Sequence, residues 1–113
     1  MLQLETHVDA ITRIGRALGD ATRCRILLML ADGPNYPAAI AESLGLTRTN
    51  VSNHLACLRG CGLVVASPEG RQVRYELAQP QLAHALGDLL DVVLAVNEDE
   101  RCLPASSSLG VLA

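Results

Sequence analysis

The sequence lacks the large aromatic side chains that fill most protein cores. It contains no Phe, no Trp and only two Tyr, although 50% of its 113 residues are hydrophobic. The core must therefore be built from Leu, Val, Ile and Ala, which favours packed helices within one domain of modest size. An aliphatic core this small also favours dimerisation, because a second copy buries further apolar surface.

Other absences exclude whole classes of protein. No apolar run is long enough to cross a membrane, and no charged N-terminus leads into an apolar segment, so we expect a cytoplasmic protein without a membrane partner. There is no Gly-rich phosphate loop, no recognisable Ser/His/Asp set and no pair of buried carboxylates, which makes an enzyme the least favoured class. Four cysteines are present without a Cys-x-x-Cys pair, which excludes a thioredoxin-type motif and the common zinc-ribbon pattern.

The charges are distributed unevenly along the chain. The formal net charge of −3 argues against a general nucleic-acid binder. However, residues 48–75 contain four arginines and one acid, whereas residues 88–100 contain five acids and no base. The chain is therefore polarised into a mildly basic middle and an acidic end.

The stretch from Leu46 to Gly62 has the pattern of a DNA recognition helix. Thr47 suits the N-cap, glycines end the helix, and an apolar stripe runs along it at helical spacing, formed by Val51, Leu55 and Leu58. Small polar residues cover the opposite side. Because Asn, Ser and Thr are poor interior helix formers, they need a reason other than helix stability, and close approach to a DNA groove is one. The alternative is an ordinary amphipathic surface helix.

The remaining pattern completes a mainly α, winged helix-turn-helix fold with about five helices and one β-hairpin. Besides the recognition helix, apolar periodicity predicts helices over residues 2–18, 21–31, 37–44 and 79–96. Strands are expected over residues 63–67 and 71–77, with a turn at residues 68–70, so that the hairpin follows the recognition helix as a wing. Outside the recognition helix, the residues expected to point inward include Cys24, Ala38, Ile40, Ala41, Leu44, Val73, Tyr75 and Leu77.

The last predicted helix is apolar on more than one face, which is typical of a helix with two packing partners. We predict that one face packs on its own domain and the other on a twin subunit, with help from the first helix. The predicted domain spans residues 1–100, and a partly disordered tail spans residues 101–113 and contains Cys102.

The predicted DNA-binding residues lie on the recognition helix and the wing. We expect Thr49, Ser52 and Asn53 at the groove, with Asn53 as the best base reader. Phosphates would be held by Arg48, Arg71 and Arg74, although a wing arginine can also be an ordinary solvated charge at a strand edge. Asn50 and His54 complete the set, His54 either touching the DNA backbone or covering the core.

Cys57 and Cys61 lie four residues apart on the recognition helix, and therefore on one face of it. Cysteine is a soft metal ligand, and these two cysteines lie on the same helix as the residues expected to face DNA. A redox-sensing disulfide between them is an alternative, but their nearly parallel Cβ vectors would strain it.

The amino-acid sequence of the predicted recognition helix resembles that of a known family. Residues 47–55, TRTNVSNHL, resemble the recognition-helix signature of the ArsR/SmtB family of metal-sensing bacterial repressors. Residues 57–65, CLRGCGLVV, and residues 69–75, EGRQVRY, resemble a cadmium- and lead-sensing branch of that family. The resemblance runs from Ile14 to Cys102. Two cysteines of that branch are replaced here by Leu4 and Asn35, so no accessory role is carried over to those positions.

This resemblance implies a homodimeric repressor that binds operator double-stranded DNA and releases it when metal binds. It also implies that Cys57 and Cys61 of one subunit combine with Cys102 of the other, which would make residues 101–113 a metal-binding tail. The family's other metal sites look absent: residues 38–44 contain no cysteine, and Leu82 and Ala95 stand where a last-helix zinc site needs Asp and His.

Three thiolates suit a soft cation such as Cd(II) or Pb(II) better than zinc, which prefers a closed tetrahedron of four ligands. Arsenite, which takes three thiolates, is an alternative, and a fourth ligand would be His54, Asp99 or water. We expect no organic cofactor. The alternatives are a thiol-redox or arsenite-sensing winged-helix repressor, and a structural dimer that binds metal but no operator.

Overall fold

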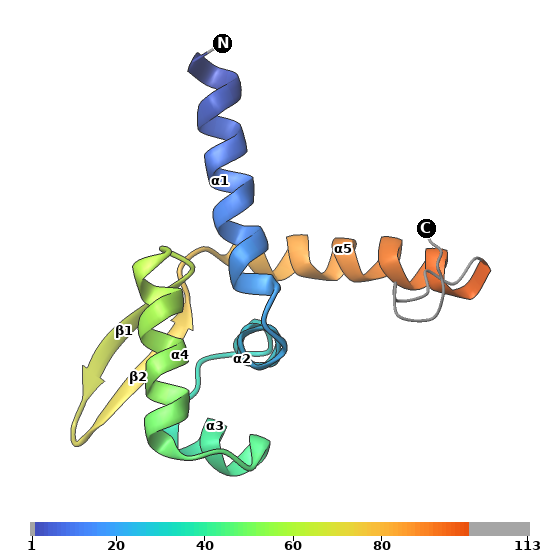
Figure 1. Cartoon of the computed structure of the whole chain (residues 1–113). Helices are drawn as coiled ribbons and strands as arrows, with labels where there is room; N and C mark the ends of the chain where they lie inside the picture. Colours follow the sequence, from blue (N-terminus) through green and yellow to red (C-terminus); the bar gives the residue numbers. More distant parts are fainter. Residues whose placement is uncertain (1, 100–113) are drawn as a thin grey trace. The chain divides into compact units, whose positions relative to one another are not determined.

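The structure is a computed structural model that describes residues 2–99, with side-chain surroundings for residues 3–95. In chain order its elements are α1 (Leu2–Leu18), α2 (Ala21–Ala31), α3 (Pro37–Leu44), α4 (Arg48–Gly60), β1 (Val64–Glu69), β2 (Gln72–Leu77) and α5 (Pro80–Asp99) (Figure 1). These elements confirm the predicted winged helix-turn-helix. The chain forms two compact units that divide within α5, between Ala83 and His84.

The helix boundaries follow from local capping chemistry. At the start of α2, the Asp20 carboxylate accepts a 2.9 Å hydrogen bond from the Arg23 backbone N–H, and the Thr47 hydroxyl oxygen accepts one of 3.0 Å from the Asn50 N–H of α4. Between α3 and α4, Gly45 has φ 69°, in the left-handed region that other residues rarely adopt. This glycine lets the chain reverse within the short turn that separates the two helices.

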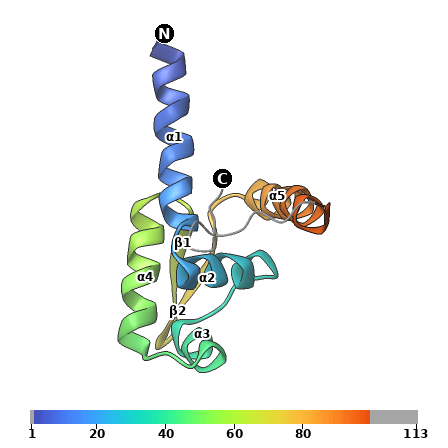
Figure 2. The ribbon, with the colours of Figure 1, turned by 45° about the vertical axis from the view of Figure 1, so that its right-hand side comes forward.

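The core of the first unit is aliphatic, as predicted. The apolar stripe of α4, formed by Val51, Leu55 and Leu58, is 0% exposed. This stripe lies against α2, α3 and β1, which α4 contacts along its length (Figure 2). The other buried hydrophobic residues of the unit are Ala17, Ile26, Leu27, Leu30, Ile40, Ala41, Leu63 and Val64.

The hairpin is longer than predicted at its tip. The expected turn at residues 68–70 is wrong, because β1 continues through Pro68 and Glu69, and Glu69 pairs with Gln72 across a two-residue loop. Gly70, with φ 64°, supplies the left-handed conformation that such a tight loop needs. The predicted second strand is correspondingly shortened, since Arg71 lies in the loop.

Pro68 is tolerated inside β1 because of its register. Tyr75 exchanges both of its backbone hydrogen bonds with Asn35, so its opposite residue on β1, Ala66, receives none from it. Bonded and non-bonded pairs alternate along an antiparallel ladder, which makes Pro68 and Val73 a non-bonded pair as well. The missing N–H of the proline therefore costs no ladder bond.

Four other expectations need correction. Ala38 is exposed at the start of α3, where it lines a surface cleft rather than the core. Val73 is 39% exposed near the tip of the wing, and Cys24 is half-buried rather than fully buried. Finally, α5 continues to Asp99 instead of ending at Val96, because no Gly or Pro in residues 97–99 interrupts it.

Two helices carry apolar side chains that this single chain leaves open. The first turns of α1 extend beyond α2 and the other elements of the first unit (Figures 1 and 2). Their exposed hydrophobic residues are Leu4, Val8 and Ile11, and those of α5 are Leu89, Leu90, Val92, Val93 and Leu94. Among the described helices, none combines the length and the hydropathy that crossing a lipid bilayer requires.

Truncating the stripe of α4 should destabilise the fold. Leu55→Ala removes a fully buried side chain and should lower the free energy of unfolding by about 2–5 kcal/mol. Val65→Ala, at a position that is 42% exposed, should cost about 1 kcal/mol or less. Urea denaturation of both variants measures the difference, and equal losses would contradict the assigned core.

Candidate nucleic-acid interface and metal-binding cysteines

The side of α4 that faces away from the core is lined by predicted DNA-binding residues. The exposed members of the set on α4 are Arg48, Thr49, Asn50, Ser52 and Asn53. Because the apolar stripe fixes the rotation of the helix, these five side chains are presented together to solvent. Polar side chains of this kind can form hydrogen bonds with the edges of bases in a DNA groove.

A cleft of about 240 Å³ separates the start of α4 from the wing. Arg48 and Ser52 line it from α4, and Arg71 lines it from the wing loop, so the fold brings these three predicted DNA contacts to one place. Arg74 does not line it. Its guanidinium lies 3.8 Å from the carboxylate of Glu76, a half-exposed surface pair that contributes little to stability.

The wing is attached to the segment before α3 at two points. At its middle, Asn35 and Tyr75 exchange backbone hydrogen bonds of 2.9 and 2.8 Å. Near its tip, the Tyr36 hydroxyl donates a hydrogen bond to the Glu69 carboxylate. This hydrogen bond, together with partial loss of hydration and the negative charge of Glu69, raises the pKa of Tyr36 above its ordinary value.

Sequence reasoning did not single out the hydrogen-bonded pair Tyr36 and Glu69. Tyr36 stands in a turn cluster, and nothing in the pattern relates it to a residue 33 positions further on. The only available signal was that Tyr36 is one of two aromatic residues in the chain.

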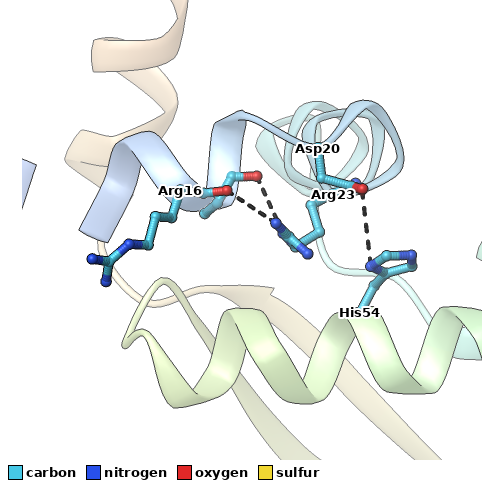
Figure 3. Close-up of polar contacts among 5 residues, drawn as sticks. Arg16, Asp20, Arg23 and His54 are labelled. Atoms are coloured by element: carbon cyan, nitrogen blue, oxygen red, sulfur yellow. Dashed lines mark hydrogen bonds and ion pairs between the residues drawn. The ribbon is translucent and has the colours of Figure 1, made fainter. Parts of the chain in front are cut away.

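His54 does not point freely into solvent. Its Nδ1 atom lies 3.9 Å from a carboxylate oxygen of Asp20, and its side chain is 23% exposed (Figure 3). Next to this pair, the Arg23 guanidinium donates hydrogen bonds of 3.0 and 3.3 Å to the carbonyl oxygens of Arg16 and Ala17. A chain of polar contacts thus connects the end of α1, the start of α2 and the middle of α4.

Asp20 is the central carboxylate of this chain. The hydrogen bond from the Arg23 backbone N–H, followed by the positive charges of Arg23 and His54, lowers the pKa of Asp20 below its ordinary value of 3.8. The ionised form of Asp20 is therefore more stable in the folded state than in the unfolded chain.

The two recognition-helix cysteines lie one helical turn apart, as predicted. The Cys61 N–H donates a 3.0 Å hydrogen bond to the Cys57 carbonyl oxygen, and both thiols are free, with Cys57 exposed and Cys61 half-buried. Cys102 lies outside the described residues, and within those residues no group of three or more His, Cys, Asp or Glu side chains is placed to hold a metal ion. Two thiols on one helical face nevertheless fit a soft cation, for which sulfur is the preferred ligand.

The polar contacts of Asp20 lead to a pH-dependent prediction. Asp20→Asn keeps a good N-cap but removes the charge, so the variant should melt at a lower temperature than the wild type at neutral pH. Because the folded-state pKa is depressed, this stabilisation is fully present above 3.8 and is lost as the pH falls through the lower folded-state value. Thermal unfolding across this range should show the two proteins converging in acid.

Asp9→Asn, at an exposed position of α1, is the matched control and should not show this convergence. A difference between Asp20→Asn and the wild type that is the same at all pH values would contradict the assigned contacts.

A short helix, a glycine turn, a helix with an exposed polar face and a hairpin that follows it directly define a winged helix-turn-helix transcriptional regulator. Residues 20–65 match the family described as bacterial regulatory protein, arsR family. Over 110 residues the chain is 60% identical to the HTH-type transcriptional regulator CmtR of Mycobacterium bovis, covering 97% of this chain and 93% of that protein. The chain therefore belongs to the arsR family of bacterial regulatory proteins, which confirms the resemblance seen in its sequence.

Solved structures agree with this assignment. The NMR structure of the cadmium metal-sensor CMTR from Mycobacterium tuberculosis is 66% identical and has a TM-score of 0.63, over 82% of this chain and 97% of that chain. A homodimeric winged helix-turn-helix DNA-binding domain from Mycobacterium bovis is 33% identical with a TM-score of 0.74, over 86% and 89% of the two chains.

Proposed function

We propose that this protein is a metal-responsive transcriptional repressor. As a homodimer it binds operator DNA through α4 and the wing, and it releases the operator when a soft heavy metal, Cd(II) or Pb(II), binds to three thiolates. These are Cys57, Cys61 and Cys102 of the partner subunit. The observation that supports this proposal best is that two free thiols lie one turn apart on the helix that also presents the polar DNA-facing residues.

The exposed face of α4 supports the DNA-binding part of the proposal. The amide of Asn53 can form paired hydrogen bonds with the edge of an adenine in the major groove. Arg48 and Arg71, on opposite sides of the cleft, can neutralise the phosphates of a DNA strand that passes between them. Phosphate contacts position the protein, and the contacts made from α4 supply the sequence preference.

Homodimerisation is supported by apolar surface that one chain leaves exposed on α1 and α5. Large exposed hydrophobic groups on two helices of a small protein are typical of an interface. The homodimeric relative has the same winged helix-turn-helix. Two recognition helices in one dimer would contact half-sites about one helical turn of DNA apart, so a small change in their spacing weakens binding.

The chemistry of the cysteines supports the metal-responsive part. A divalent cation bound by three thiolates carries a net negative charge and stabilises the thiolates in their ionised form. Cys57 is exposed and so accessible to a ligand from another chain. Acidic residues at 98–100 precede Cys102 in the sequence. Capture of that segment therefore brings negative charge to a helix that must approach phosphates, and this disfavours the DNA-bound state. The relative whose structure is named as a cadmium metal-sensor responds to a cation of this class.

The metal response can be tested by cysteine substitution. Operator binding of the wild type should weaken on addition of cadmium by roughly 5–150-fold, the range of a typical allosteric coupling. Cys57→Ser, Cys61→Ser and Cys102→Ser should bind the operator normally but lose this response. Fluorescence anisotropy with labelled operator DNA measures both properties.

Cys24→Ser is the matched control, because Cys24 lies on α2 and should not affect release. Release by peroxide but not by cadmium would favour the thiol-redox alternative, and release by arsenite alone would favour an arsenite sensor. Cadmium-induced release of the Cys57→Ser variant would exclude the proposed metal site.

The division of roles between base reading and phosphate binding gives a second test. Asn53→Ala should cost about 1–3 kcal/mol of operator affinity and relax the preference for operator over unrelated DNA. Arg71→Ala should instead weaken binding to all sequences and reduce the slope of log K against log salt by about 0.9. Arg13→Ala, at an exposed arginine of α1, is the control and should change neither quantity.

A further inference from the structure

The loop at the tip of the wing carries Arg71, to which the proposed function assigns a phosphate contact. Arg71 lies in the two-residue loop between Glu69 and Gln72, at the far end of a hairpin of only two strands. A hairpin of two strands has little stability of its own and needs packing against another element. Beyond Ala66 and Tyr75, where the Asn35 backbone bonds hold the middle of the wing, three more residue pairs extend to the loop.

A side-chain hydrogen bond attaches this outer part of the wing to the segment before α3. Glu69 is the last residue of β1, and its carboxylate accepts a hydrogen bond from the Tyr36 hydroxyl. Tyr36 is the N-cap residue of α3, so it belongs to the helix-turn-helix and not to the wing. The bond therefore connects the helix-turn-helix, which contains α4, directly to the last residue of β1 before the wing loop.

The same tyrosine lines the cleft between the recognition helix and the wing. Tyr36 shares this cleft with Arg48 and Ser52 of α4 and with Arg71 of the loop. The hydrogen bond to Glu69 therefore attaches the end of β1 to a residue that lines the cleft together with the two arginines.

We propose that the Tyr36–Glu69 hydrogen bond sets the distance between Arg71 of the wing and Arg48 of α4, and that Tyr36 is a positioning residue for DNA binding. This inference rests on the proposed function, since it assigns the phosphate contact of Arg71 to a wing held in place before DNA arrives. Arginine is a long, flexible side chain, and ordering its backbone in advance removes part of the entropy that binding would otherwise cost. The bond also orients a carboxylate two residues from Arg71 that would otherwise be free to pair with the arginine.

The experiment combines Tyr36→Phe and Arg71→Ala in a double-mutant cycle. The probe is a DNA duplex selected by the wild-type protein from a random library, and the measured quantities are its affinity and the slope of log K against log salt. Tyr36→Phe removes only one hydroxyl group. It should weaken binding several-fold and reduce the salt slope by up to about 0.9, the value for one phosphate contact. In the Arg71→Ala background the same substitution should change neither quantity, because the contact that it positions has already been removed.

Two further variants separate this role from a general effect on folding. Glu69→Ala breaks the same bond from the other side and should reduce the salt slope as Tyr36→Phe does. Only its slope is compared, because the loss of a negative charge raises affinity for DNA by itself. Tyr75→Phe removes the other phenol hydroxyl of the cleft and should leave the slope unchanged. All variants are compared by circular dichroism and thermal unfolding, and the slopes are read at a temperature where each is folded.

The possible failures are distinguishable. If the wild type selects no DNA, the proposed function itself is wrong. If the wild type binds but Tyr36→Phe keeps the wild-type affinity and slope, or loses equal affinity with and without Arg71, the positioning role is excluded.

Discussion

The burial of one apolar stripe on α4 determines most of what this molecule presents to its surroundings. Val51, Leu55 and Leu58 are completely buried against the neighbouring helices and β1. A helix packed in this way cannot rotate about its axis without exposing these side chains, at a cost of roughly 1.5–3 kcal/mol for each. The rotation of α4 is therefore fixed, and with it the direction of every other side chain on the helix.

That fixed rotation places two chemistries on one rigid element. The polar face near the N-terminal end of α4 is exposed. Two thiols, one helical turn apart, lie near its C-terminal end. Between them, His54 faces Asp20, and Arg23 connects Asp20 with the carbonyl oxygens at the end of α1. A displacement of α4 would therefore alter polar contacts that reach the end of α1. That helix has apolar side chains exposed in the single chain. Because coupling between two ligands is reciprocal, the proposed release of operator DNA by metal requires that operator DNA weaken metal binding by the same factor.

The sequence predicted those features that depend on neighbours along the chain. Helix starts at Asp20 and Thr47 follow from side-chain capping, and the end of α3 follows from Gly45. The hairpin turn was misplaced because Pro68 usually signals a turn, and only the register shows that its missing N–H is harmless there. Periodicity alone gives no such register.

The polar contacts of the candidate site were the least predictable part. The bond between Tyr36 and Glu69 and the pairing of His54 with Asp20 join residues far apart in the chain. The first depends on how the start of α3 meets the wing, and the second on how α2 packs against α4. The cysteine pair was predictable because its spacing is that of one helical turn, whereas the place of Cys102 depends on a segment outside the described residues. Local spacing thus identified the candidate ligands on α4, and tertiary packing determined their surroundings.

The proline in β1 has a consequence for how copies of this protein behave when crowded together. A two-stranded sheet leaves an outer edge whose unpaired N–H groups can recruit a strand from another molecule. Since Pro68 lies at a non-bonded position of the ladder, its nitrogen points to that outer edge. Proline has no N–H there to donate to a strand of another molecule. The proline therefore makes the outer edge of the wing a poorer template for aggregation.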